Sequence, residues 1–133
     1  LREFYYTGRE KGPMTDEQYY EALVKLAGEE KMPVIVDPSA ASFIQCIRSH
    51  AQLSVRKAKN GVLSGIRHTA GELEAGRLLF HSSCKDTVRE FGLYRWDDKA
   101  AKDQPIKEND HAMDDTRYFV ETVVYGGRSF SFQ

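Results

Sequence analysis

The sequence has 133 residues, of which 41% are hydrophobic, 29% charged and 11% aromatic, a composition typical of one globular domain and a length too short for two. Nineteen Lys and Arg residues against twenty Asp and Glu residues leave a formal net charge of −1, so binding to nucleic acid or to an anionic membrane would need a local basic patch. No apolar stretch approaches the roughly 20 residues of a membrane span, and the first residues lack the apolar run of a secretory signal, so we expect a cytoplasmic protein without a membrane partner.

The predicted elements begin with a short strand and a polar loop, after which Thr15 introduces the first helix. An apolar strand then ends at Asp37, and Pro38 opens a second helix. Asn60 is expected to cap the third helix and Gly76 to end it. In full, strands are predicted over residues 4–6, 34–36, 53–58 and 77–81, and helices over residues 16–28, 40–51, 62–76, 84–96 and 110–127.

The order of these elements predicts an α/β fold with a largely parallel sheet. Each pair of neighbouring parallel strands needs a crossover connection, and that connection is normally a helix. No internal repeat or low-complexity segment interrupts the pattern. We therefore expect a single domain over residues 1–133.

The two cysteines are expected to be reduced and structural. Cys46 falls in the second predicted helix and Cys84 at the entry to the fourth, far apart in the sequence. No CxxC pattern and no companion histidine spacing marks either of them as a metal ligand.

Asp37 ends the apolar VIV strand and is the first candidate site residue. In open α/β sheets the ligand crevice lies outside the carboxyl ends of the strands, where a carboxylate can reach a metal ion or a substrate. The alternative is a turn or N-cap role at the start of the next helix, which aspartate also serves well.

A second group of charged residues stands at the entry to the last predicted helix. Asp110, His111 and Asp114 share one face of that helix near its N-terminus, and Glu108 and Asp115 lie beside them. Carboxylates with one imidazole can hold a divalent cation, and they suit Mg²⁺ or Mn²⁺ better than Zn²⁺. The alternative is an acidic helix start that is favourable to the helix dipole, with Asp110 or Asn109 as the cap.

Four segments occur in one order with short gaps between them: VIVDPSAASF, NGVLSGI, GRLLFHSSCKDTVREFGLYRW and KENDHAMDDTRYFV. Over nearly the whole chain they resemble the C-terminal nuclease domain of the large terminase subunit of tailed bacteriophages and prophages, the motor-nuclease that packages DNA. The resemblance implies an RNase H-like fold, a mixed sheet with flanking helices. It also implies a metal-dependent endonuclease that hydrolyses DNA phosphodiesters with two divalent ions, Mg²⁺ or Mn²⁺.

The resemblance assigns roles to three residues. Asp37 corresponds to the family's second catalytic acid and Asp114 to its third, and both would ligate metal. His111 corresponds to the imidazole near the metals, where it can orient water or move a proton. Asp110 and Asp115 are weaker candidates.

The family's first acid lies upstream of the segment that matches REFYY, so no residue of this chain is assigned to it. The phosphate-binding motif GxxxxGK[ST] of the ATPase half does not occur either. The resemblance therefore implies a domain that is incomplete at its N-terminal side, lacks the first strand or strands of the fold, and has weak nuclease activity or none by itself.

The partners implied are double-stranded DNA and, within the packaging machine, the terminase ATPase domain, the small subunit and the portal. Local basic residues would contact phosphates, or else they are solvated side chains that balance nearby acids; they are Arg56, Lys57, Lys59 and Arg67. Exposed strand edges recruit partners, so a homo-oligomer formed by strand exchange is also expected.

Two other functions stay open at this point. One is a catalytically dead prophage remnant that acts as a DNA-binding or assembly module. The other is a flavodoxin-like phosphate-binding domain in which the residues after Asp37 cradle an anion at a helix N-terminus, although the sequence has no glycine-rich loop there.

Overall fold

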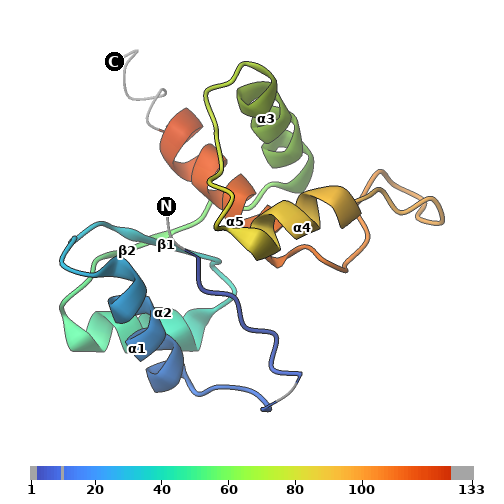
Figure 1. Ribbon diagram of the computed structural model, residues 1–133. Coiled ribbons are helices and arrows are strands. Elements are labelled where there is room, and N and C mark those ends of the chain that lie inside the picture. The colour runs from blue at the N-terminus through green and yellow to red at the C-terminus, as the bar shows by residue number, and fades with distance from the viewer. Residues whose placement is uncertain (1–2, 10, 127–133) are drawn as a thin grey trace. The chain divides into compact units, whose positions relative to one another are not determined.

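The computed structural model describes residues 3–9 and 11–126. The chain divides into two compact units, of which the N-terminal one ends at Lys57 and the C-terminal one begins at Ala58. Figure 1 shows the elements of each unit. Within the described residues, no helix combines the length and the hydropathy that crossing a bilayer requires.

The N-terminal unit is built around a strand-helix-strand crossover. Its elements are α1 (Asp16–Ala27), β1 (Val34–Val36), α2 (Ala41–His50) and β2 (Val55–Lys57). The two strands pair in parallel, with Val34 opposite Val55 and Val36 opposite Lys57. The crossover helix between parallel strands confirms the α/β expectation for this unit.

Helix α1 begins directly after Thr15, as the sequence predicts, and the structure shows a capping box there. Gln18 N–H donates to Thr15 Oγ1 at 3.2 Å, and Thr15 N–H donates to Gln18 Oε1 at 2.8 Å. The apolar faces of α1 and α2 meet β1 in a small core of buried residues. These residues are Tyr20, Val36, Ile44 and Ile47.

The C-terminal unit is helical. Its elements are α3 (Val62–Glu74), α4 (Lys85–Leu93), α5 (His111–Phe119) and the π-helix η1 (Val120–Tyr125), which continues directly from α5. Helix α3 packs against both α5 and η1, and α4 packs against α5 (Figure 1). The π-helical end was not predicted, because a period of 3.6 residues cannot anticipate a wider turn.

Two predicted strands are wrong. Residues 4–6 and 77–81 have strand-forming composition, but neither segment pairs with another strand. Tyr6 instead packs edge-on against Tyr19 and donates its hydroxyl to the carbonyl of Gly12. Phe80 likewise packs edge-on against Phe91 of α4. High strand propensity reflects side chains that suit a half-buried surface. In both segments an aromatic side chain packs against a helix, and the backbone forms no strand hydrogen bonds.

The sheet is consequently small: within the described residues it consists of the two strands β1 and β2. The protein is a mixed α/β structure with a small parallel sheet and helices. The finer expectation, an RNase H-like sheet within a single domain, stays a prediction.

Candidate functional site

Asp37 lies directly after β1 and shapes the turn into α2. Its Oδ1 accepts hydrogen bonds from the N–H and the hydroxyl of Ser39, both at 2.9 Å. This is an aspartate-initiated turn. The N-cap of α2 is Ala40, so Asp37 acts through the turn and not as the cap. The side chain is half-buried, at the carboxyl end of a parallel strand, where a ligand can reach it.

The start of α5 is capped by a residue from another helix. Oε1 of Glu90, in α4, accepts the N–H groups of Ala112 at 2.8 Å and Met113 at 3.2 Å. Glu90 is fully buried. Its carboxylate accepts these two donors at the positive end of the helix dipole, an arrangement that favours a negative charge. Asp110 occupies the N-cap position but makes no side-chain capping bond.

The predicted capping roles of Asn109 and Asn60 are therefore wrong. Asn109 has a left-handed backbone, with φ of 51°, and its side-chain oxygen accepts a hydrogen bond from Arg89 at 3.0 Å. The N-cap of α3 is Gly61, without a side-chain cap. The carbonyl of Asn60 is used instead, as an acceptor for Arg117 at 2.8 Å.

Asp114 is held by a buried arginine one helical turn further along α5. Arg117 Nη2 donates to Asp114 Oδ1 at 2.8 Å, while Arg117 Nη1 donates to the carbonyls of Asn60 at 2.8 Å and Gly61 at 3.1 Å. The arginine thus engages Oδ1 of Asp114, and the side chain of Asp114 stays partly exposed. The sequence signal for this pair is the three-residue spacing on one helix, which was not among the predicted contacts.

His111 is the first residue of α5 and is exposed, as is Asp115. Asp110 is buried, with 9% of its surface exposed. His111 and Asp114 lie one turn apart on the same helix, so the structure keeps these two predicted site residues close in the C-terminal unit. Asp37 belongs to the N-terminal unit, and its convergence with Asp114 stays a prediction.

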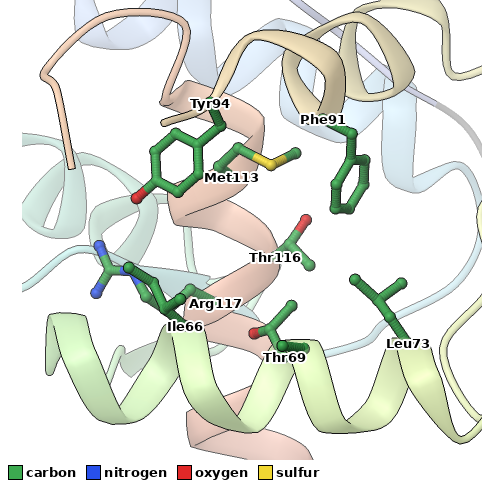
Figure 2. A pocket seen from close by; sticks show the side chains of 9 residues that line it. Ile66, Thr69, Leu73, Phe91, Tyr94, Met113, Thr116 and Arg117 are labelled. Atoms are coloured by element: carbon green, nitrogen blue, oxygen red, sulfur yellow. The ribbon is translucent and has the colours of Figure 1, made fainter. Parts of the chain in front are cut away.

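A cavity of about 160 Å³ adjoins Arg117, between α3, α4 and α5. Figure 2 shows Tyr94, Met113 and Phe91 on one side of it and the α3 side chains on the other. Its remaining lining residues are Ile66, Thr69, Ala70, Leu73, Thr116 and Arg117. Burial raises the pKa of the Tyr94 phenol, the charge of Asp114 raises it further, and the charge of Arg117 opposes both. This mainly apolar space is a poor fit for a metal ion.

The predicted DNA-contacting residues are all exposed. Arg56 and Lys57 lie on β2 in the N-terminal unit, and Lys59 and Arg67 lie in the C-terminal unit. The backbone N–H of Lys59 donates to Thr122 Oγ1 at 2.9 Å, which fixes that residue against η1. A single phosphate-facing ridge built from all four stays a prediction.

A further group of metal-ligand side chains was not predicted from the sequence. Glu17, Cys46 and His50 each offer a ligand atom, and these atoms all lie within 4.8 Å of one another. The expectation that Cys46 has no companion histidine is wrong, because His50 follows four residues later on α2. Both cysteines are free thiols, as predicted.

The chain is therefore a mixed α/β protein with candidate metal ligands, Asp37 after β1 and Asp114 in the first turn of α5. No family model matches the sequence. Among solved structures, the large terminase of a thermophilic bacteriophage in complex with ADP has a TM-score of 0.88 and 46% identity, over 92% of this chain and 32% of that chain. The same phage protein with ATP-γ-S has a TM-score of 0.86 and 46% identity, over 91% of this chain and 32% of that chain.

A curated relative points the same way. The large terminase subunit of Escherichia phage T5 is 25% identical over 99 residues, which are 70% of this chain and 23% of that protein. The chain is therefore homologous to phage terminase large subunits. It spans about a third or less of the length of these relatives.

Proposed function

We propose that this chain is the nuclease part of a phage terminase large subunit, and that Asp37 and Asp114 are ligands for Mg²⁺ or Mn²⁺. The homology to large terminases supports the family, and the resemblance of the four sequence segments supports the nuclease part. The chain would act on double-stranded DNA during genome packaging, together with an ATPase domain, the small subunit and the portal.

The observation that carries the proposal is the arrangement of Asp114. Arg117 is only 4% exposed and holds one carboxylate oxygen of Asp114, while the side chain of Asp114 stays 21% exposed. A carboxylate fixed by a buried neighbour and still open to solvent is preorganised to bind a cation. Carboxylate oxygens are the ligands that Mg²⁺ and Mn²⁺ prefer, so the donor set fits these ions.

The resemblance suggests the roles of the other residues, and their placement supports them. Asp37 brings a second carboxylate from the end of β1, fixed by its two bonds from Ser39. His111 is exposed at the start of α5, where its imidazole can orient a water molecule or exchange a proton with solvent. Divalent ions in such sites supply activation of the attacking water and stabilisation of the leaving oxygen.

Binding of Mn²⁺ tests this proposal without requiring turnover. We expect the full chain to remove the electron paramagnetic resonance signal of free Mn²⁺, and both Asp37→Asn and Asp114→Asn to weaken the affinity at least about tenfold, or 1.4 kcal/mol. The matched control Asp115→Asn, one residue along α5, should bind as the unmodified chain does. Equal affinity in all four proteins would contradict the assignment of the ligands.

Nicking of supercoiled plasmid tests the activity itself. Cleavage that requires Mn²⁺ and disappears in Asp114→Asn supports the nuclease. Retention of DNA without a cation and without cleavage would instead favour the DNA-binding or assembly module. Light scattering tests the expected homo-oligomer, since a monomer would exclude strand exchange.

A further inference from the structure

We infer that Glu17, Cys46 and His50 form a second cation site, specific for a thiophilic divalent ion of which Zn²⁺ is the type, and that the ion joins α1 to α2. This site is separate from the proposed Mg²⁺ or Mn²⁺ ligands. All three of its ligands lie in the N-terminal unit, and the inference does not depend on the nuclease activity.

The three side chains converge from two helices. Glu17 lies in the first turn of α1, and Cys46 and His50 are four residues apart on α2, so the latter two share one face. His50 Nε2 lies 2.8 Å from Glu17 Oε2, and the thiol of Cys46 donates to Glu17 Oε1 at 3.3 Å. The carboxylate therefore contacts both other ligands.

These separations are close to those that a bound ion requires. Two atoms on one tetrahedral Zn²⁺, at about 2.0–2.3 Å from the metal, lie roughly 3.3–3.8 Å from each other. The ligand atoms here are all within 4.8 Å of one another. Small adjustments of the side chains would bring the atoms to these separations, and the proton of the thiol would leave to solvent as the ion binds.

The orientation of His50 is already set. Its ring stacks on Tyr20, with centroids 3.9 Å apart and planes inclined by 6°. Tyr20 is itself buried, at 5% exposure, and its hydroxyl donates to Gln52 Oε1 at 2.8 Å. A buried aromatic residue thus holds the imidazole ring with Nε2 toward Glu17, so the ring needs little reorientation to ligate an ion.

The donor set selects the class of ion. Sulfur, imidazole nitrogen and one carboxylate oxygen are the ligand types found on Zn²⁺ in proteins, whereas Mg²⁺ and Ca²⁺ require oxygen ligands. Three protein ligands leave a fourth position for water or another donor. Because Glu17 and Cys46 come from different helices, the ion would cross-link them and stabilise the folded unit by mass action.

Spectroscopy with Co²⁺ as the probe tests the site in the full chain. We expect one Co²⁺ to bind at this site, with a thiolate-to-metal band in the near ultraviolet that Zn²⁺ abolishes by displacement. Cys46→Ser should lose the band, and His50→Gln should weaken binding at least tenfold. The matched control Cys84→Ser should keep the thiolate band. This variant should also fold, because serine is favoured at the N-cap position that Cys84 occupies. Asp114→Asn should also keep it, which separates this site from the proposed nuclease ligands.

A thiolate band that is missing from the unmodified chain, or that survives in Cys46→Ser, would overturn the inference. Alkylation provides a second measurement on the unmodified chain, so the test does not depend on the folding of a variant. Zn²⁺ should slow the alkylation of Cys46 at least tenfold, while Mg²⁺ leaves it unchanged and neither ion affects Cys84. Equal alkylation rates of Cys46 with and without Zn²⁺ would also overturn it.

Discussion

Gly65 of α3 lies directly against the side chain of Arg117. A Cβ atom at residue 65 would be 2.1 Å from Cγ and 2.5 Å from Cδ of Arg117. Arg117 cannot easily withdraw, because it is buried and its guanidinium binds Asp114 and two backbone carbonyls. Because residue 65 has no side chain, Arg117 has room to bind Asp114, a candidate metal ligand.

Substitution of this glycine should therefore destabilise the C-terminal unit. We expect Gly65→Ala to lower the free energy of unfolding by about 1–3 kcal/mol, the usual cost of overpacking. Urea denaturation followed by circular dichroism measures it. The control is Gly71→Ala on the same helix, where an added Cβ meets no atom within 4 Å; it should stabilise the protein by about 0.5–1 kcal/mol. Equal effects at the two glycines would exclude steric contact with Arg117 as the cause.

Substitution of Glu90, the cap of α5, should lower the free energy of unfolding. Glu90→Ala leaves the N–H groups of Ala112 and Met113 without their acceptor, and we expect a loss of about 2–4 kcal/mol in the free energy of unfolding. Glu90→Gln keeps a side-chain oxygen and should lose less. The control Glu74→Ala removes an exposed carboxylate at the end of α3 and should change stability by under about 0.5 kcal/mol. Similar losses in the Ala and Gln variants would argue against capping through Oε1.

The phenol of Tyr94 should ionise at a higher pH than that of an ordinary tyrosine. Burial raises its pKa, so the folded state favours the protonated form and the unfolded state loses the proton first. The resulting stability is complete below about pH 10 and is lost as pH rises through the higher folded pKa. Ultraviolet titration of the chain minus that of Tyr94→Phe should give a midpoint above about 10. The unmodified chain should also lose more stability than Tyr94→Phe as the solution becomes strongly alkaline, and a midpoint no higher than that of an ordinary tyrosine would contradict the burial effect.

Local patterns in the sequence predicted the elements whose causes are local. Thr15 predicted the start of the first helix, and its capping partner Gln18 is only three residues further along the chain. The apolar VIV strand followed by Pro38 predicted the start of the crossover. Asp114 was identified from its place at a helix start and from the family resemblance. These features depend on residues within one or two turns of each other.

The features that were missed depend on residues far apart in the chain. Glu90 caps a helix that begins 21 residues later, since α5 starts at His111, and no local pattern marks such a partner. Cys46 and His50 share a helix face, but the third ligand, Glu17, comes from α1. The segment at residues 77–81 has strand composition without a strand to pair with, and a sequence does not show whether that neighbour exists.

The π-helix at the end of the described chain determines where this region can change in length. Within η1, Glu121 contacts His68, and the ring of Tyr125 stacks on His68 with centroids 3.8 Å apart. A π-helix closes each hydrogen-bonded turn over five residues where an α-helix uses four, so η1 holds one residue more than an α-helix of the same rotation. Removing one residue from η1, with a return to ordinary helical geometry, would leave the direction of Tyr125 nearly unchanged. Removing one from α5 would instead rotate Tyr125 by roughly 100°, away from His68. A one-residue deletion should therefore be tolerated in η1 and not in α5.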